Sequence, residues 1–122
     1  TSRAKMNALR VMVAARIYAS NHGGKFPDTS EEFKEMSDPS FFWVAMDSQD
    51  VLEPLVYAGA GLNDQDPGDL PVVWSPRPNT DGWRVVARLD GSNEAMHEDK
   101  FQEVLTKLRE HLAKQADASK KP

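Results

Sequence analysis

The three histidines are the first side chains to test for chemistry, because imidazole acts as a general base and as a metal ligand near neutral pH. His22, His97 and His111 lie in three separate segments of the chain. None belongs to a His-Glu-x-x-His run, and no two have the spacing that brings two metal ligands to one face of a helix. We therefore expect surface or helix-capping roles for all three.

Other catalytic patterns are also missing from the sequence. The chain has no cysteine, which removes thiol nucleophiles, disulfides and thiolate metal sites. No serine stands in a Gly-x-Ser-x-Gly motif, and the Gly-x-Gly at Gly59–Gly61 lacks the third glycine of a dinucleotide-binding loop. No pair of acidic residues is isolated in an apolar setting that would separate their pKa values for acid–base work. The sequence predicts a protein that is not an enzyme.

One loop is rich in carboxylate and amide oxygens. Asn63, Asp64, Asp66 and Asp69 lie within seven residues that also contain Pro and Gly. Calcium takes about six to eight oxygen ligands from carboxylates, carbonyls and water, so Asp64, Asp66 and Asp69 are candidate Ca²⁺ ligands. The EF-hand pattern is not met, because no Glu closes the loop. A solvated turn explains the same residues, and no other cofactor is indicated.

Three tryptophans are the remaining candidates for contact with a ligand. Trp43, Trp74 and Trp83 all fall in segments with strand character. Indole rings line sugar-stacking grooves, and they also fill protein cores. A groove for a glycan or a peptide and a plain core role are therefore both compatible with these residues.

The charges are segregated along the chain, although the net charge is only −4. Residues 1–25 carry five basic and no acidic side chains, residues 26–70 carry eleven acidic and one basic, and residues 71–122 carry nine basic and eight acidic. The opposite blocks can pair between copies of the chain, which makes Arg3, Lys5, Arg10 and Arg16 candidate assembly residues. A pI near 5.3 argues against a nucleic-acid partner.

An amphipathic helix is predicted from Ser2 to His22. Its apolar residues Met6, Leu9, Val13 and Ile17 recur at steps of three, four and four, and the glycine pair after His22 ends it. The periodic pattern begins within the first few residues without a convincing cap. We expect the helix to continue upstream into a segment that this chain lacks.

The rest of the chain predicts short strands followed by a second helix. Trp83 to Leu89 alternates in strand fashion, and Asp90-Gly91 indicates a hairpin turn into a return strand near Asn93–Met96. Phe101 to Leu112 carries a helical apolar stripe with acids before it and bases further on, as the helix dipole favours. Shorter elements are expected at 30–36 (helix), 41–44, 55–58 and 70–74 (extended).

Length and composition predict a single domain. A chain of 122 residues is the size of one compact unit, which we place at residues 1–114, with a frayed tail at 115–122. The longest uninterrupted apolar run, Phe41–Met46, has six residues, which is too short to span a bilayer.

The first helix and the turn after it resemble the segment that follows the membrane-spanning part of bacterial type II secretion pseudopilins and their type IV pilin-like relatives. The resemblance rests on Asn7-Ala8-Leu9-Arg10, on Tyr18-Ala19-Ser20-Asn21 and on Gly24-Lys25-Phe26-Pro27. Tyr57–Leu62, Val72–Pro78 and Gly82–Gly91 are similar to the branch with a terminal Asp-Gly-His motif, so that the likeness covers about residues 5–110. Ser92-Asn93 stand where those relatives have His and Val, and their frequent cysteines are absent.

This resemblance implies an α+β fold in which a long N-terminal helix packs on a small antiparallel sheet. It implies a non-catalytic subunit on the periplasmic side of the bacterial inner membrane, anchored by an upstream hydrophobic helix that this chain lacks. The implied partners are other pseudopilin-like subunits and inner-membrane secretion components. Some major pseudopilins hold Ca²⁺ near the sheet, which favours the calcium interpretation of Asp64, Asp66 and Asp69. The alternative is a periplasmic or surface ligand-binding module that uses Trp43, Trp74 and Trp83.

Overall fold

The computed structural model describes residues 2–32, 43–45 and 52–120. It contains two long helices and six short strands within these ranges. In chain order the elements are α1 (Ser2–Ser20), the 3-10 turn η1 (Ser30–Glu32), β1 (Trp43–Ala45), β2 (Leu52–Pro54), β3 (Val56–Tyr57), β4 (Pro71–Trp74), β5 (Trp83–Arg88), β6 (Asn93–His97) and α2 (Glu98–Lys120).

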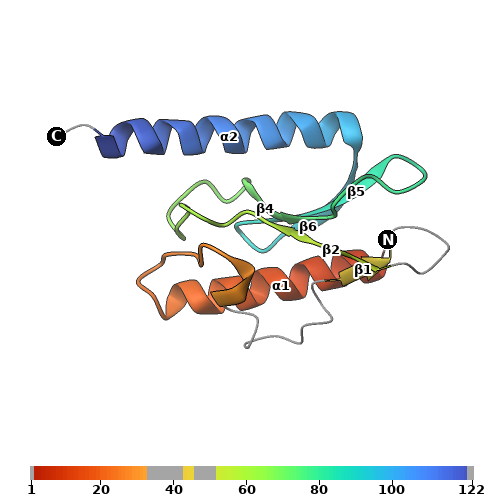
Figure 1. Cartoon of the computed structure of the whole chain (residues 1–122), viewed down its shortest axis with the longest axis horizontal. Helices are drawn as coiled ribbons and strands as arrows, with labels where there is room; N and C mark the ends of the chain where they lie inside the picture. The colour runs from red at the N-terminus through yellow and green to blue at the C-terminus, as the bar shows by residue number, and fades with distance from the viewer. Residues whose placement is uncertain (1, 33–42, 46–51, 121–122) are drawn as a thin grey trace.

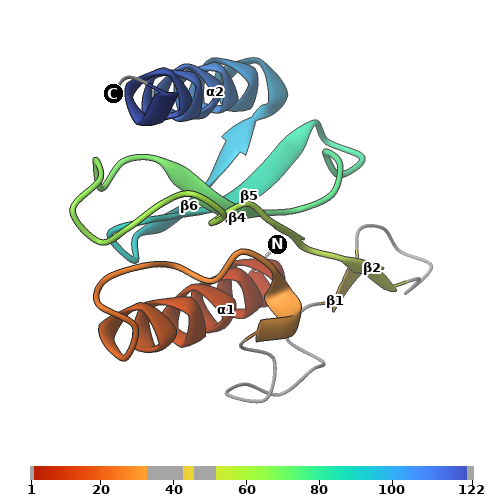
Figure 2. The same ribbon diagram turned by 60° about the vertical axis from the view of Figure 1, so that its left-hand side comes forward.

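A four-stranded antiparallel sheet separates the two helices. Its strand order is β3-β4-β5-β6, and β1 pairs with β2 in a separate two-stranded ribbon. Figures 1 and 2 show α1 against one face of the four-stranded sheet and α2 against the other. The expected α+β architecture, with the N-terminal helix on a small antiparallel sheet and a helix at the C-terminal end, is confirmed.

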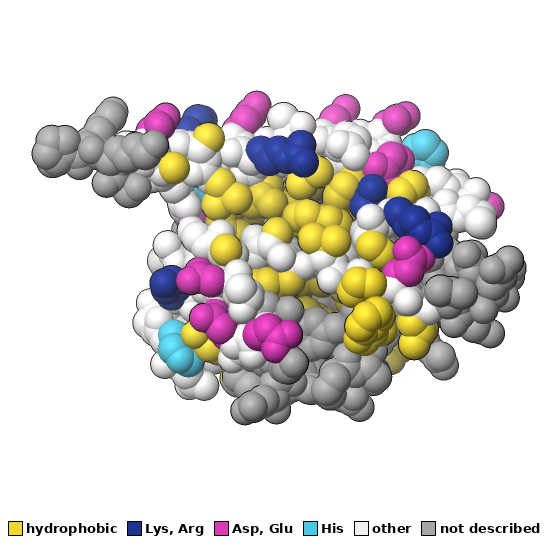
Figure 3. Space-filling view, viewed as in Figure 1, with side chains coloured by type: hydrophobic (Ala, Val, Ile, Leu, Met, Phe, Trp, Pro, Cys, Tyr) yellow, Lys and Arg dark blue, Asp and Glu magenta, His cyan; other side chains and the backbone are white. Residues whose placement is uncertain are grey.

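Strand β4 lies in the middle of these three layers. All four of its residues, Pro71–Trp74, are buried, because one face of the strand meets α1 and the other meets α2. A strand covered on both faces needs apolar residues at every position instead of alternation. On the α2 side, the Trp74 ring packs edge-on against Phe101, with 5.6 Å between ring centroids. Apolar side chains fill the seam below α2 (Figure 3).

The face of α1 that meets the sheet is made mainly of alanine. The buried α1 side chains are small except for Val11 and Met12; the others are Ala4, Asn7, Ala8, Ala14, Ala15 and Ala19. Short side chains let a helix backbone approach the sheet closely, and close packing yields dispersion energy from many atom pairs. Three hydrogen bonds add to the packing. Asn7 Nδ2 donates to the Trp43 carbonyl at 3.2 Å, Asn93 Nδ2 to the Lys5 carbonyl at 2.8 Å, and Arg16 to the Asp90 carbonyl at 3.1 Å.

The larger apolar residues that the periodicity singled out on α1 lie outward. Met6 is 51% exposed, Leu9 37%, Val13 46% and Ile17 46%. We call these four residues the outer row of α1. The sequence pattern found a real apolar face, but the helix has two, and the alanine face is the one that packs on the sheet. An alanine methyl group is only weakly hydrophobic compared with Val or Ile, so the periodicity of the larger residues marks the outer face and not the face that packs on the sheet.

Helix α2 is fixed to the sheet at its first turn by Arg84. The Arg84 guanidinium binds the Glu98 carboxylate with two hydrogen bonds, of 2.6 and 3.2 Å, and donates a third, of 3.0 Å, to the Ser75 carbonyl. It also lies over the Phe101 ring, 4.4 Å from its centroid. The hydrogen bonds from Arg84 hold the pKa of Glu98 below its usual range. The bidentate pair therefore holds the first turn of α2 against the sheet.

Most boundaries lie close to those expected, with one clear exception. The β5–β6 hairpin is confirmed, with Trp83 opposite His97 and Ala87 opposite Asn93. The exception is α2, which continues through residues 115–120, where a frayed tail was expected. Gln115 anchors this extension by a hydrogen bond to the 63–69 loop. Residues 33–36 of the expected short helix, 41–42 of the expected strand and 121–122 lie outside the described ranges.

None of the helices in the described residues is both long and apolar enough to cross a membrane.

The two methionines of α1 provide a matched test of its orientation. Met12 is fully buried and Met6 is 51% exposed. Met12→Ala is expected to lower the free energy of unfolding by about 2–5 kcal/mol, because it leaves a cavity under the helix. Met6→Ala is expected to change it by no more than about 0.5 kcal/mol. Urea unfolding measures both, and a larger loss for Met6→Ala would show that the outer row faces the core.

Candidate functional site

The acidic loop at residues 63–69 is held beside the end of α1 by backbone pairing. The Asp64 amide donates to the Gly24 carbonyl at 2.8 Å, and the Phe26 amide donates to the Leu62 carbonyl at 3.1 Å. Lys25 and Asn63 form an isolated antiparallel bridge between them. The residues that follow α1 therefore form backbone hydrogen bonds, as in a short antiparallel strand pair, with the start of the acidic loop.

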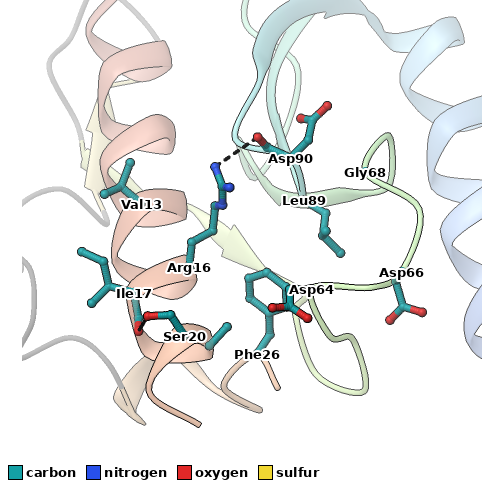
Figure 4. Close-up of a pocket in the computed structure, with 11 residues that line it drawn as sticks. Val13, Arg16, Ile17, Ser20, Phe26, Asp64, Asp66, Gly68, Leu89 and Asp90 are labelled. Atoms are coloured by element: carbon teal, nitrogen blue, oxygen red, sulfur yellow. Dashed lines mark hydrogen bonds between the residues drawn. The ribbon is translucent and has the colours of Figure 1, made fainter. Parts of the chain in front are cut away.

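A cavity of about 640 Å³ opens between α1, this loop and the β5–β6 turn. Figure 4 shows its wall of α1 side chains, with Phe26 and the loop opposite. Its described lining residues are Val13, Arg16, Ile17, Ala19, Ser20, Phe26, Asp64, Asp66, Gly68, Leu89 and Asp90. The volume lies in the usual range of small-ligand pockets, which combine an apolar lining with a few polar groups. We call it the α1 cavity.

Arg16 crosses the mouth of the α1 cavity toward the β5–β6 turn (Figure 4). Its Nη1 donates to the Asp90 carbonyl at 3.1 Å, and a Cβ on Gly91 would lie 2.5 Å from the same nitrogen. Gly91 also has a φ of +89°, where other residues are strained. The positive φ favours glycine at position 91, and a larger residue there would also require the Arg16 side chain to move.

The Asp90-Gly91-Ser92 segment that resembles the Asp-Gly-His motif has a local structural role. Asp90 Oδ1 accepts hydrogen bonds from the Ser92 amide at 2.9 Å and from its hydroxyl at 2.6 Å. These bonds, with Arg88 and Arg16 nearby, hold the pKa of the Asp90 carboxyl below its usual range. Asp90 is therefore an ionised group on the cavity rim at neutral pH.

Asp64 is the second charged group set against a glycine. A Cβ on Gly24 would lie 2.5 Å from Asp64 Oδ1, so a larger residue at position 24 would require the Asp64 side chain to shift. Gly24 also has a φ of +91°. The side-chain partner that the structure gives Asp64 is neutral, the Gln65 amide at 3.2 Å.

Asp66 connects the loop to α2. Its Oδ1 accepts hydrogen bonds from His111 Nε2 at 3.0 Å and from Gln115 Nε2 at 2.8 Å, and its Oδ2 accepts one from the Asn63 amide at 2.8 Å. The side chain is only 10% exposed, and Figure 4 shows it on the far side of the cavity from α1. We call Asp66, His111 and Gln115 the loop–α2 latch.

Burial and hydrogen bonding act on the pKa of Asp66 in opposite directions. Burial disfavours the charged carboxylate, but the bonds from Asn63, His111 and Gln115 favour it more strongly, and the net effect lowers the pKa. The expectation that His111 is a surface or capping residue is therefore wrong, since it is partly buried and bound to Asp66.

The other two histidines lie on the surface, as expected. His22 Nδ1 is 2.7 Å from the Tyr18 carbonyl, and its ring stacks on the Tyr18 ring. His97 packs edge-on against Trp83. The hydrogen-bond partners that the structure gives His111 are Asp66 and Gln115, neither of which is a nucleophile of the Ser–His–Asp type.

The predicted calcium ligands do not converge. Asp66 is committed to α2, Asp64 faces the α1 cavity, and Asp69 is exposed and is not among the lining residues. In the part of the chain that the structure describes, no group of three or more His, Cys, Asp or Glu side chains is placed to hold a metal ion. The calcium site stays a prediction.

The three tryptophans occupy different environments. Trp74 is 8% exposed and belongs to the core, whereas Trp43 and Trp83 are 46% and 44% exposed. Trp74 therefore cannot share an open groove with the other two. A ligand surface on this molecule would rest on Trp43 or Trp83.

The basic residues of the first segment that were singled out for assembly all lie on α1. Lys5 is partly buried, and Arg10 and Arg16 are exposed. Arg16 is the one that reaches the α1 cavity. Arg3 lies in the first turn of α1, and its side chain is outside the described part.

Sequence reasoning missed the α1 cavity and the loop–α2 latch. Both join segments that are far apart in the chain: His111 lies 45 residues from Asp66, and Arg16 lies 74 from Asp90. One local signal was present. His111 and Gln115 are four residues apart on α2, so they share a face next to the apolar stripe.

The chain was compared with protein-family models, with curated proteins and with solved structures. None of the three comparisons found a match.

Removal of the Asp66 charge tests the latch. Asp66→Asn is expected to lower the free energy of unfolding by about 2 kcal/mol at neutral pH, because hydrogen bonds to a charged group are lost. The native pKa is lowered, so the stabilisation is complete above the ordinary carboxyl value of 3.8 and disappears as the pH falls through the native value. Urea unfolding of both proteins from neutral to acidic pH measures this.

Asp69→Asn is the matched control, because Asp69 is an exposed acid in the same loop. Its effect is expected to stay within about 0.5 kcal/mol. Equal losses in the two variants, or a loss for Asp66→Asn that persists at acidic pH, would contradict the latch.

The calcium prediction has a direct thermal test. Calcium that binds the native state raises the unfolding midpoint by mass action, and Asp64→Asn and Asp69→Asn are expected to reduce that rise. A midpoint that does not move at millimolar Ca²⁺ removes the site.

Proposed function

We propose that this chain is a non-catalytic, pseudopilin-like subunit of a bacterial secretion or pilus-type envelope assembly. The observation that carries the proposal is the outer row of α1, four apolar side chains that stay 37–51% exposed along a helix otherwise packed on the sheet. An apolar row of this length is typical of a surface that another helix or subunit covers.

The distribution of charges around α1 supports head-to-tail contacts between copies of the chain. Lys5 and Arg10 lie in the first half of α1, whereas Arg16 lies with the acidic loop near the other end of the helix. Neighbours shifted along the helix axis would bring basic and acidic ends together, and a heterologous contact of this kind extends into a filament. The resemblance of residues 5–110 to pseudopilins supports the same arrangement.

The proposal places the domain on the periplasmic side of the inner membrane, anchored by an upstream helix. Its partners would be other pseudopilin-like subunits and inner-membrane secretion components. The role needs no catalytic group and no nucleic-acid contact. It uses the outer row as the contact surface.

A ligand-binding module is the second candidate function. The exposed indoles of Trp43 and Trp83 favour it, because half-exposed tryptophan is common where proteins contact sugars and peptides. Trp43 shares one face of the β1–β2 ribbon with Leu52 and Pro54, which are also exposed.

Site-specific crosslinking tests the first proposal, because the chain has no cysteine of its own. Met6→Cys and Val13→Cys place thiols in the outer row of α1. Glu103→Cys and Glu110→Cys, at exposed positions of α2, are the controls. The complete gene, with each variant in turn, is expressed in bacterial membranes, and each thiol is labelled with a maleimide–benzophenone, which crosslinks to any neighbouring chain on illumination and needs no thiol on the partner.

Crosslinks from the outer row to a second copy or to another pilin-like subunit are expected, with little product from α2. Mass spectrometry identifies the partner. Crosslinking from α2 alone, or no product from Met6→Cys and Val13→Cys, would contradict the proposal.

A further inference from the structure

The α1 cavity has a floor and a rim of different character. The floor is apolar, and the rim carries charges from α1, the acidic loop and the β5–β6 turn. The apolar lining residues are Val13, Ile17, Ala19, Phe26 and Leu89. A ligand that fits must therefore have an apolar part for the floor and a polar part for the rim.

The charges of the rim are predominantly negative. Asp64, Asp66 and Asp90 contribute carboxylates, and among the described lining residues Arg16 is the one cation. The pKa values of Asp66 and Asp90 are lowered, so both are ionised at neutral pH. Asp66 is bound by His111 and Gln115, so an anion at this rim meets mainly the carboxylates of Asp64 and Asp90, whereas a cation is attracted to them.

Arg16 does not reverse this preference. Its guanidinium is directed at the Asp90 carbonyl and rests against the backbone of Gly91. Asp64 differs, because its carboxylate has the neutral Gln65 amide as its side-chain partner. Within the residues that the structure describes, no cation is paired with Asp64, so its carboxylate is a negative group next to the apolar floor.

The charged groups of Arg16 and Asp64 each lie close to a glycine, Gly91 and Gly24 respectively. Any side chain at Gly24 would displace the Asp64 carboxylate, and any at Gly91 would displace the Arg16 guanidinium.

We propose that the α1 cavity binds an amphipathic organic cation, that is, an ammonium or guanidinium group on an apolar stem. The stem lies on the floor formed by Ile17, Phe26 and Leu89, and the cation lies against Asp64. Two sources carry this chemistry: a free aliphatic amine, and a Lys or Arg side chain of another polypeptide. The inference does not depend on the proposed assembly role, since it rests on the cavity alone.

Titration with simple probes, followed by amide NMR, tests the inference. Butylammonium represents the free amine, N-acetyl-lysine methylamide the side chain, and butyrate an anion of similar stem length, all at matched ionic strength. Butylammonium or the lysine probe is expected to shift the amides of Val13, Gly24, Gly68 and Leu89 in a saturable way. Butyrate is not.

Three variants make the test specific. Asp64→Asn is expected to weaken cation binding about tenfold, or about 1.4 kcal/mol, whereas Asp69→Asn, outside the cavity, stays within about twofold. Val13→Lys, at an exposed position, supplies a tethered ammonium and is expected to block the added amine while the rim acids remain. A native amide spectrum for each variant shows that folding is retained.

Both sources support the inference when they bind, and their relative affinities distinguish them. Tighter binding of the lysine probe assigns the cavity to a polypeptide side chain, and equal or tighter binding of butylammonium assigns it to free amines. Absence of saturable shifts with both cations, stronger binding of butyrate, or an unchanged affinity in Asp64→Asn would overturn the inference.

Discussion

The close packing of the alanine face of α1 on the sheet is the interaction on which the rest of this structure depends. Small side chains at Ala8 and Ala15 bring the helix near β4 and β5, and the other face of the same strands is closed by α2. This double cover explains why β4 is apolar at every position. It also forces the larger apolar residues of α1 to the outside, which creates the outer row that the proposed assembly uses.

The position of α1 also determines the candidate site. Because α1 ends at Ser20, the turn after it runs back along the acidic loop, and Gly24 pairs with Asp64. Arg16 then reaches the β5–β6 turn across the gap that remains, and this gap is the α1 cavity. The loop is held on its far side by Asp66, which binds α2. The position of α1 on the sheet therefore determines where the outer row, the α1 cavity and Asp66 of the loop–α2 latch lie.

The elements that depend on local sequence could be predicted. The β5–β6 hairpin followed from alternation and from Asp90-Gly91, and the end of α1 followed from the glycine pair after His22. The inward face of α1 could not, because alanine carries a weak hydrophobic signal and the stronger signal of Val13 and Ile17 lies on the opposite face. Packing distance decided the orientation, and no local pattern encodes that distance.

The candidate site was only partly predictable for a related reason. The acidic loop was recognised from its composition, but its three aspartates serve different neighbours. Asp66 binds His111 and Gln115, and Asp64 lies on the cavity rim, whereas Asp69 is exposed. These assignments depend on which distant segments the fold brings to the loop. The composition of the loop does not contain that information.

The solvent accessibility of the α1 methyl groups tests the account most directly. Methyl NMR of the dilute chain, with a soluble paramagnetic probe, compares Val13 and Ile17 of the outer row with Val11, which is fully buried. The account predicts strong broadening of the Val13 and Ile17 methyl signals and little broadening of those of Val11. Little broadening of the Val13 and Ile17 methyl signals, together with strong broadening of those of Val11, would contradict this prediction. The outer row of α1, and not its alanine face, would then pack on the sheet.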